Sequence, residues 1–245
     1  MDIALFIKQR SGLGSVNRRL HERKGRIAYL GASVTRQKDG YRPRFHDWLC
    51  TQTGHSHQAI NACLGGMGIL SAVYLMDKLV IRYRPDLCFI EFTSSDAALD
   101  QASVDVGPGL EGVIRKLLAA GCVPCILHMH RLDGACGPGS EVRAQYEAIA
   151  EHYGVPSIFV CDVMSTALRE NQEEEQVWYR DVVHTTPAGA DYIARFLSQA
   201  LEYLFTISDK NGADLPLCLL PDNHQYTRMV PILLLLNKRS AQSFS

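Results

Sequence analysis

Short apolar runs alternate with stretches of helical apolar spacing between residues 26 and 205. Strands that are separated along the chain by helices pair in parallel, and their sheet needs helices on both faces. The alternation therefore predicts an α/β fold with a parallel sheet. The five expected strands are residues 27–30, 58–62, 87–92, 123–129 and 156–160, and the expected helices are residues 15–22, 41–54, 70–83, 113–120, 143–153 and 187–205.

The domain organisation follows from where this alternation begins and ends. A chain of 245 residues can form one sizeable core without dividing. We therefore expect an N-terminal approach segment at residues 1–24, one main domain at residues 25–207 and a C-terminal extension at residues 208–245. Because the alternation ends near Phe205, we also expect truncation after Ser208 to leave a folded domain.

Composition excludes several classes of partner and location. The net charge of −1 and the isoelectric point near 6.7 provide no basic surplus for binding nucleic acid or an anionic membrane. No apolar stretch reaches the roughly 18 residues of a membrane span, and the first residues lack the pattern of a secretion signal. The eight scattered cysteines fit reduced thiols better than a disulfide framework. We expect a soluble, cytoplasmic protein.

The first apolar run places a serine just past the end of a strand. Ser33 follows Gly31, and in parallel sheets the carboxyl ends of the strands carry the functional sites. A serine hydroxyl needs a base and an orienting carboxylate to act as a nucleophile. An aspartate three residues before a histidine can reach the imidazole Nδ1–H, and Asp181-Val-Val-His184 has this spacing. We therefore predict Ser33 as nucleophile, His184 as base and Asp181 as the residue that orients it.

Four short segments occur in order at expected strand ends: Gly31-Ala-Ser-Val-Thr35, Asn61-Ala-Cys-Leu-Gly-Gly66, Phe89-Ile-Glu-Phe-Thr-Ser-Ser-Asp96, and Asp181-Val-Val-His184 followed by Thr186-Pro-Ala-Gly189. Together they resemble the motifs of the SGNH hydrolases, also called GDSL-type esterases. Two positions depart from that family, because Ala32 replaces the usual aspartate and Ser95 replaces the asparagine. The resemblance covers roughly residues 26–205 and implies a three-layer α/β/α sandwich with a flavodoxin-like five-stranded parallel sheet.

The resemblance also implies a reaction. The oxyanion would be held by the backbone N–H groups of Ser33 and Gly66 and by the side chain of Ser95. The expected function is that of a serine esterase or acylhydrolase that cleaves a small acyl ester, such as acetyl on a carbohydrate, without a metal or organic cofactor. Two alternatives stay open: an acyltransferase with the same triad, and a non-catalytic module that binds a glycan or a protein.

Four further polar residues lie near the expected site. Arg36 and Asp96 flank catalytic segments, and His130 shares one face of its strand with His128, so we expect Arg36, Asp96 and His130 to contact substrate. Two histidines without a placed carboxylate make a thin metal site, and we expect no metal there. Glu91 lies inside an apolar strand, where a lone carboxylate is costly, so it needs a buried partner or a position that faces the site.

Overall fold

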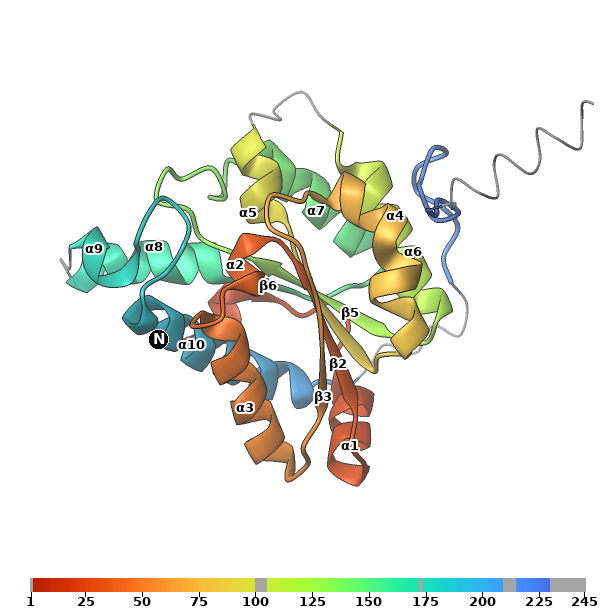
Figure 1. The fold of residues 1–245 in the computed structure, drawn as a ribbon, viewed down its shortest axis with the longest axis horizontal. Coiled ribbons are helices and arrows are strands. Elements are labelled where there is room, and N and C mark those ends of the chain that lie inside the picture. Colours follow the sequence, from red (N-terminus) through yellow and green to blue (C-terminus); the bar gives the residue numbers. More distant parts are fainter. Residues whose placement is uncertain (1, 100–104, 172–173, 209–214, 230–245) are drawn as a thin grey trace, which may run out of the picture.

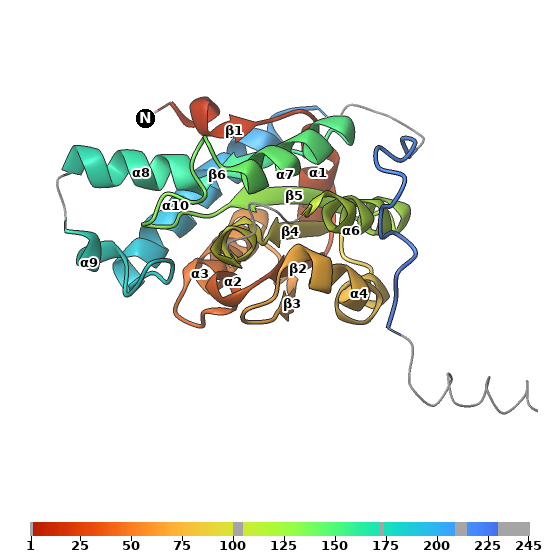
Figure 2. The same cartoon turned by 90° about the horizontal axis from the view of Figure 1, so that it is seen from above.

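The computed structural model describes residues 2–99, 105–171, 174–208 and 215–229. Within these residues six strands form one sheet in the order β1-β6-β5-β4-β2-β3, and helices cover both of its faces (Figures 1 and 2). The strands are β1 (Ile7–Lys8), β2 (Arg26–Gly31), β3 (Gln58–Cys63), β4 (Leu87–Glu91), β5 (Val123–His128) and β6 (Ser157–Phe159). The longer helices are α1 (Gly14–Glu22), α3 (Tyr41–Thr53), α4 (Ile69–Leu79), α6 (Gly107–Ala119), α7 (Glu141–His152), α8 (Val160–Asn171) and α10 (Pro187–Phe205). Single turns of helix are α2 (Ser33–Arg36), α5 (Thr93–Asp96) and α9 (Glu175–Trp178), with 3₁₀ turns η1 (Ile3–Phe6), η2 (Ile81–Tyr83) and η3 (Ala97–Leu99).

The α/β fold agrees with the sequence prediction, but the strand count does not. Strands β2 to β6 are the five that were predicted, and they are parallel to one another. The sixth strand, β1, is antiparallel and pairs Ile7 with Ile158 and Lys8 with Ser157. It belongs to residues 1–24, which were expected to form only an approach segment. A strand of two residues is too short to leave a periodic signal, so only its pairing with β6 reveals it.

The two faces of the sheet divide the core between two groups of helices. Along β2, Ile27 and Tyr29 point to one face while Ala28 and Leu30 point to the other, because successive strand side chains alternate. Helices α1, α3, α8 and α10 pack against the first face, and α4, α6 and α7 pack against the second (Figure 2). All four of these β2 side chains are at most 1% exposed. The core therefore fixes β2, the strand that leads into Ser33.

The C-terminal segment at residues 215–229 packs along α6 (Figure 1). The carboxylate of Glu111 is fully buried and accepts hydrogen bonds from the backbone N–H groups of Leu219 (2.6 Å) and Leu220 (2.9 Å). A Cβ atom on Gly112 would lie 2.7 Å from the carbonyl carbon of His224, so the segment lies directly on the helix backbone. These contacts make the segment part of the packed structure rather than a removable extension.

We therefore predict that truncation after Ser208 destabilises the protein. Removing residues 219 and 220 leaves the buried Glu111 carboxylate without two donors, and an unsatisfied buried group costs about 1–3 kcal/mol, more when it is charged. For a chain of this size we expect the unfolding temperature to fall by roughly 5 °C or more. Removing only residues 230–245 keeps every one of these contacts and serves as the control. Equal unfolding temperatures for the two truncations would contradict the prediction.

Candidate active site

The turn after β2 carries Ser33 to the edge of the sheet where the parallel strands end. Helix α2 begins at Ser33 itself. A Cβ atom on Gly31 would lie 2.5 Å from Thr35 Oγ1 and 2.9 Å from the carbonyl oxygen of Glu91. Only glycine lets β2 run this close to α2 and to β4. The local sequence thus accounts for the tight turn that presents the serine.

The structure brings the three predicted triad residues together. The hydroxyl of Ser33 lies 2.9 Å from Nε2 of His184, and Nδ1 of His184 lies 2.9 Å from Oδ2 of Asp181. Oδ1 of Asp181 also accepts hydrogen bonds from the backbone N–H groups of Val183 (2.9 Å) and His184 (2.8 Å). Partial burial would raise the pKa of Asp181, but these donors outweigh it and hold the pKa at about 2. The aspartate is therefore ionised at any pH at which a protein of this kind works.

The loop that carries His184 is fastened to the loop that follows Ser33. Gln37 Nε2 donates to the carbonyl oxygen of Thr185 at 2.7 Å, and Arg180 forms an ion pair with Asp39. Tyr179 and Thr185 form an isolated antiparallel bridge across the base of the loop. These contacts outside the triad hold the loop of His184 against the loop of Ser33.

A cavity of about 150 Å³ opens beside Ser33. Val34, Ser94, Ser95, Ala98, Arg131 and Val183 line it together with Ser33 and Gly66. Gly66 has a φ of +72°, a left-handed conformation in which glycine carries no steric penalty. Its N–H donates to no acceptor in the described part of the chain, and the first N–H groups of a helix such as α2 lack an intrahelical acceptor. Ser33, at the first position of α2, and Gly66, with its N–H unpaired among the described residues, both line the cavity, so a backbone oxyanion hole there stays a prediction.

Ser95 lines the cavity, but its hydroxyl is already engaged. Ser95 Oγ lies 2.9 Å from the carbonyl oxygen of Met67 and 3.1 Å from that of Phe92, and it is the donor in both contacts. A hydroxyl has one proton to donate. The geometry therefore does not support the expected role of Ser95 as an oxyanion donor, and assigns it instead to holding the loop after Gly66 against the start of α5.

Comparison with known proteins gives one kind of match. No protein-family model and no curated protein matches the sequence. Among solved structures, a two-domain esterase active on acetylated mannans matches with a TM-score of 0.79 and 20% identity, over 90% of this chain and 62% of that chain. An acetyl xylan esterase matches with a TM-score of 0.61 and 17% identity, over 72% and 99%. A lipase/acylhydrolase from Enterococcus faecalis matches with a TM-score of 0.58 and 17% identity, over 77% and 100%.

The chain has the fold of the SGNH hydrolases. The resemblance seen in the four sequence segments is thus confirmed at the level of fold. The chain spans about three fifths of the length of the two-domain mannan esterase, 62%. What these proteins act on is a property of those proteins, and reaches this chain only as a proposal.

Within this SGNH fold the three expected substrate contacts occupy different places. Arg36 is exposed, and a Cβ atom on Gly65 would lie 3.4 Å from its Nη1 and 3.9 Å from Ser33 Cβ, so the guanidinium stands beside the nucleophile. Asp96 is 1% exposed and accepts hydrogen bonds from the Ile69 N–H and the Tyr146 hydroxyl. The expectation that Asp96 contacts substrate is therefore wrong, because its carboxylate is turned into the core.

His130 is also withdrawn from the cavity. It is 8% exposed, and a 3.0 Å hydrogen bond joins its Nδ1 to the hydroxyl of Tyr179. Burial lowers the pKa of His130 to about 4, so the ring is neutral at ordinary pH. This position suits anchoring the loop that carries Asp181 and His184 rather than touching substrate. Sequence reasoning missed Arg131, which does line the cavity and follows His130 directly.

A buried carboxylate connects the nucleophile turn to the turn after β4. Glu91 is fully buried at the end of β4 and accepts hydrogen bonds from the hydroxyls of Thr35, at 2.9 Å, and of Ser94. Thr35 in turn is hydrogen-bonded to the hydroxyl of Tyr41. Burial raises the pKa of Glu91 to about 7, although the hydroxyl donors and the Ala32 backbone oppose the shift. The sequence expectation of a buried partner is met by these hydroxyls.

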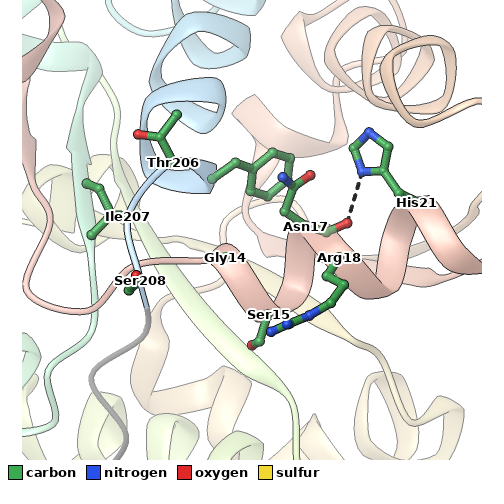
Figure 3. A pocket seen from close by; sticks show the side chains of 9 residues that line it. Gly14, Ser15, Asn17, Arg18, His21, Thr206, Ile207 and Ser208 are labelled. Atoms are coloured by element: carbon green, nitrogen blue, oxygen red, sulfur yellow. Dashed lines mark hydrogen bonds between the residues drawn. The ribbon is translucent and has the colours of Figure 1, made fainter.

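A larger hollow of about 600 Å³ lies between α1 and the end of α10 (Figure 3). Asn17, Arg18 and His21 reach it from α1, and Nδ1 of His21 is hydrogen-bonded to the carbonyl oxygen of Asn17 at 3.0 Å (Figure 3). Helix α1, which lines the hollow, precedes β2 in the chain, whereas Ser33 follows the last residue of β2. Among the described residues that line the hollow there is no carboxylate to orient the imidazole.

The described residues provide neither a metal-holding cluster nor a membrane-spanning helix. In that part of the chain no cluster of three or more histidine, cysteine, aspartate or glutamate residues is placed to hold a metal ion. His128, which sequence analysis paired with His130, is instead buried against Glu147 at 2.9 Å. Among the same residues, no helix has the length and apolar character needed to cross a membrane.

The raised pKa of Glu91 predicts a pH dependence of stability. Its ordinary value is 4.5, so between about pH 4.5 and pH 7 the folded state binds a proton that the unfolded state has lost. Stability from this group is then present at low pH and lost as pH rises through about 7. Buried Asp96, with a pKa raised to about 6, acts in the same direction.

Glu91→Gln, which mimics the protonated form, should therefore gain unfolding temperature relative to wild type when the pH rises from 5 to 8. Thermal unfolding of both proteins at pH 5 and pH 8 gives the difference in unfolding temperature between variant and wild type at each pH. Glu22→Gln, which changes an exposed carboxylate on α1, should show no such gain. A difference in unfolding temperature between Glu91→Gln and wild type that stays the same from pH 5 to pH 8 would contradict the raised pKa of Glu91.

Proposed function

We propose that this chain is a serine hydrolase of the SGNH type that cleaves small acyl esters, such as acetyl groups on a carbohydrate. The observation that carries the proposal is the position of His184, which lies 2.9 Å from the Ser33 hydroxyl on one side and 2.9 Å from the Asp181 carboxylate on the other. This spacing lets one ring accept a proton from serine while the carboxylate stabilises the imidazolium that forms.

The proposed reaction has two halves. Ser33 Oγ attacks the ester carbonyl as its proton passes to His184 Nε2, and the N–H groups of Ser33 and Gly66 stabilise the oxyanion. The intermediate expels the alcohol, which takes the proton from Nε2, and the acyl group stays on Ser33. Water then attacks this acyl ester and gives its proton to Nε2, after which Ser33 leaves, recovers the proton and releases the carboxylic acid.

The size of the cavity supports a small acyl group. Its volume of about 150 Å³ equals that of roughly five water molecules, which accommodates an acetyl group. Structures with this fold include an esterase active on acetylated mannans and an acetyl xylan esterase. Together these observations favour an acetyl ester of a carbohydrate as substrate, with the exposed Arg36 beside the nucleophile as a contact for the sugar.

Exposure of the triad favours hydrolysis over transfer to another acceptor. The side chains of His184 and Asp181 are 35% and 53% exposed, so water reaches the face of the imidazole on which deacylation occurs. A non-catalytic binding module would not require a serine hydrogen-bonded to an imidazole that is itself hydrogen-bonded to a carboxylate. The net charge of −1 supports a small ester or glycan rather than a nucleic acid or membrane surface as partner. Eight free cysteines support a cytoplasmic location.

A fluorophosphonate probe and a short-chain nitrophenyl ester test the proposal. The probe should label Ser33, and Ser33→Ala and His184→Ala should each lower ester hydrolysis by about 10⁴-fold or more. Ser165→Ala is the matched control, because its hydroxyl donates only to the Cys161 carbonyl one helical turn away. Labelling at another serine, or hydrolysis that survives in His184→Ala, would refute the triad.

A further inference from the structure

The oxyanion hole of the proposed esterase has two free backbone donors and no free side-chain donor on the side of Ser95. The Ser95 hydroxyl is directed to the carbonyl oxygens of Met67 and Phe92. Each donor aimed at the oxyanion typically contributes about 10²–10³ in rate. A site built on backbone groups alone would lack that contribution unless another residue on the cavity wall supplies it.

Arg131 lies on that wall. It follows β5, lines the same cavity as Ser33 and Gly66, and its side chain is only 9% exposed. The whole cavity is about 150 Å³, so Ser33, Gly66 and Arg131 line one small space. Arg131 contributes a cation to this small volume.

The guanidinium is held in place and still has donors to spare. It forms an ion pair with Asp133, using Nε–H and one Nη2–H, and donates one Nη1–H to the carbonyl oxygen of Ser94 at 3.1 Å. A guanidinium has five N–H groups, so one N–H on Nη1 and one on Nη2 have no acceptor in the described part of the chain. The Asp133 side chain is 41% exposed, so solvent screens its charge more than that of a buried partner.

We propose that Arg131 is a catalytic residue that donates a hydrogen bond to the substrate oxygen as that oxygen becomes an oxyanion, in the place where the SGNH motif has asparagine. This assignment rests on the proposed esterase function. No bond to Arg131 forms or breaks in the reaction. The guanidinium stays charged throughout and compensates a negative charge that exists only in the transition state and the intermediate.

Arg131→Ala should lower kcat for a nitrophenyl acetate by about 100- to 1000-fold, with KM within about threefold of wild type, because the interaction forms mainly in the transition state. Two rescues then distinguish a missing donor from a damaged fold. Millimolar guanidinium chloride should restore kcat of Arg131→Ala at least about tenfold by entering the vacated space. Ser95→Asn in the Arg131→Ala background should restore it similarly by supplying an amide donor. Arg131→Lys keeps the positive charge without the paired N–H donors of the guanidinium, so its kcat should fall less than that of Arg131→Ala. It also tests the assignment if Arg131→Ala does not fold.

Arg143→Ala is the matched control. Arg143 is also largely buried and paired with a carboxylate, that of Asp162 at 2.6 and 2.7 Å, but it does not line the cavity. Its loss should change kcat less than about threefold and should not respond to guanidinium. An active Arg131→Ala, or an inactive one that neither rescue restores, overturns this assignment alone. A wild-type chain without Ser33-dependent hydrolysis overturns the proposed function and the assignment together.

Discussion

The parallel register of β2 with its two neighbours is the constraint on which the site depends. Gly31 stands opposite Cys63 of β3 and opposite Glu91 of β4. The three strands therefore end at the same level, and the chain segments that leave them carry Ser33, Gly66 and Ser94 to one edge of the sheet. Gly66 and Ser94, which are 33 and 61 residues from Ser33 in sequence, line one cavity with it because backbone hydrogen bonds in the sheet fix where the three segments begin. The loop before α10 then carries Asp181 and His184 to Ser33 and completes the triad.

The residues that could be predicted from the sequence are those whose roles depend on local spacing. Asp181 reaches the imidazole of His184 within one turn of chain, so the pair is visible in four consecutive residues. Four of the parallel strands, β2, β4, β5 and β6, were predictable because they are mostly buried runs, and β3 because it alternates buried Ile60 and Ala62 with less buried residues. Helix α8, by contrast, follows β6 without a break, at Phe159 and Val160, and therefore shows no boundary in the sequence. The antiparallel β1 depends entirely on pairing with a strand about 150 residues away.

The parts of the site that could not be predicted depend on where hydroxyl and guanidinium groups find partners. Ser95 stands at the motif position of a donor, but its hydroxyl donates to the carbonyl oxygens of Met67 and Phe92. Asp96 lies in the same turn, and its carboxylate accepts a hydrogen bond from the hydroxyl of Tyr146 on α7. Arg131 reaches the cavity only because β5 lies beside β4 in the sheet. No local pattern encodes the contacts of Ser95 with Met67 and of Asp96 with Tyr146, since these join segments 28 and 50 residues apart.

The buried carboxylate of Glu91 explains why position 32 has an alanine in place of the family's aspartate. Ala32 is 1% exposed and packs into the core on the side of α4 and α6, so an aspartate there would be buried as well. The buried carboxylate of Glu91 is hydrogen-bonded to the Ala32 backbone, which is among the groups that lower its pKa. Two buried carboxylates so close together would raise each other's pKa, and one would have to remain protonated. With alanine at position 32, a single carboxylate accepts the hydroxyls of Thr35 and Ser94 and joins the nucleophile turn to the cavity wall without a competing charge.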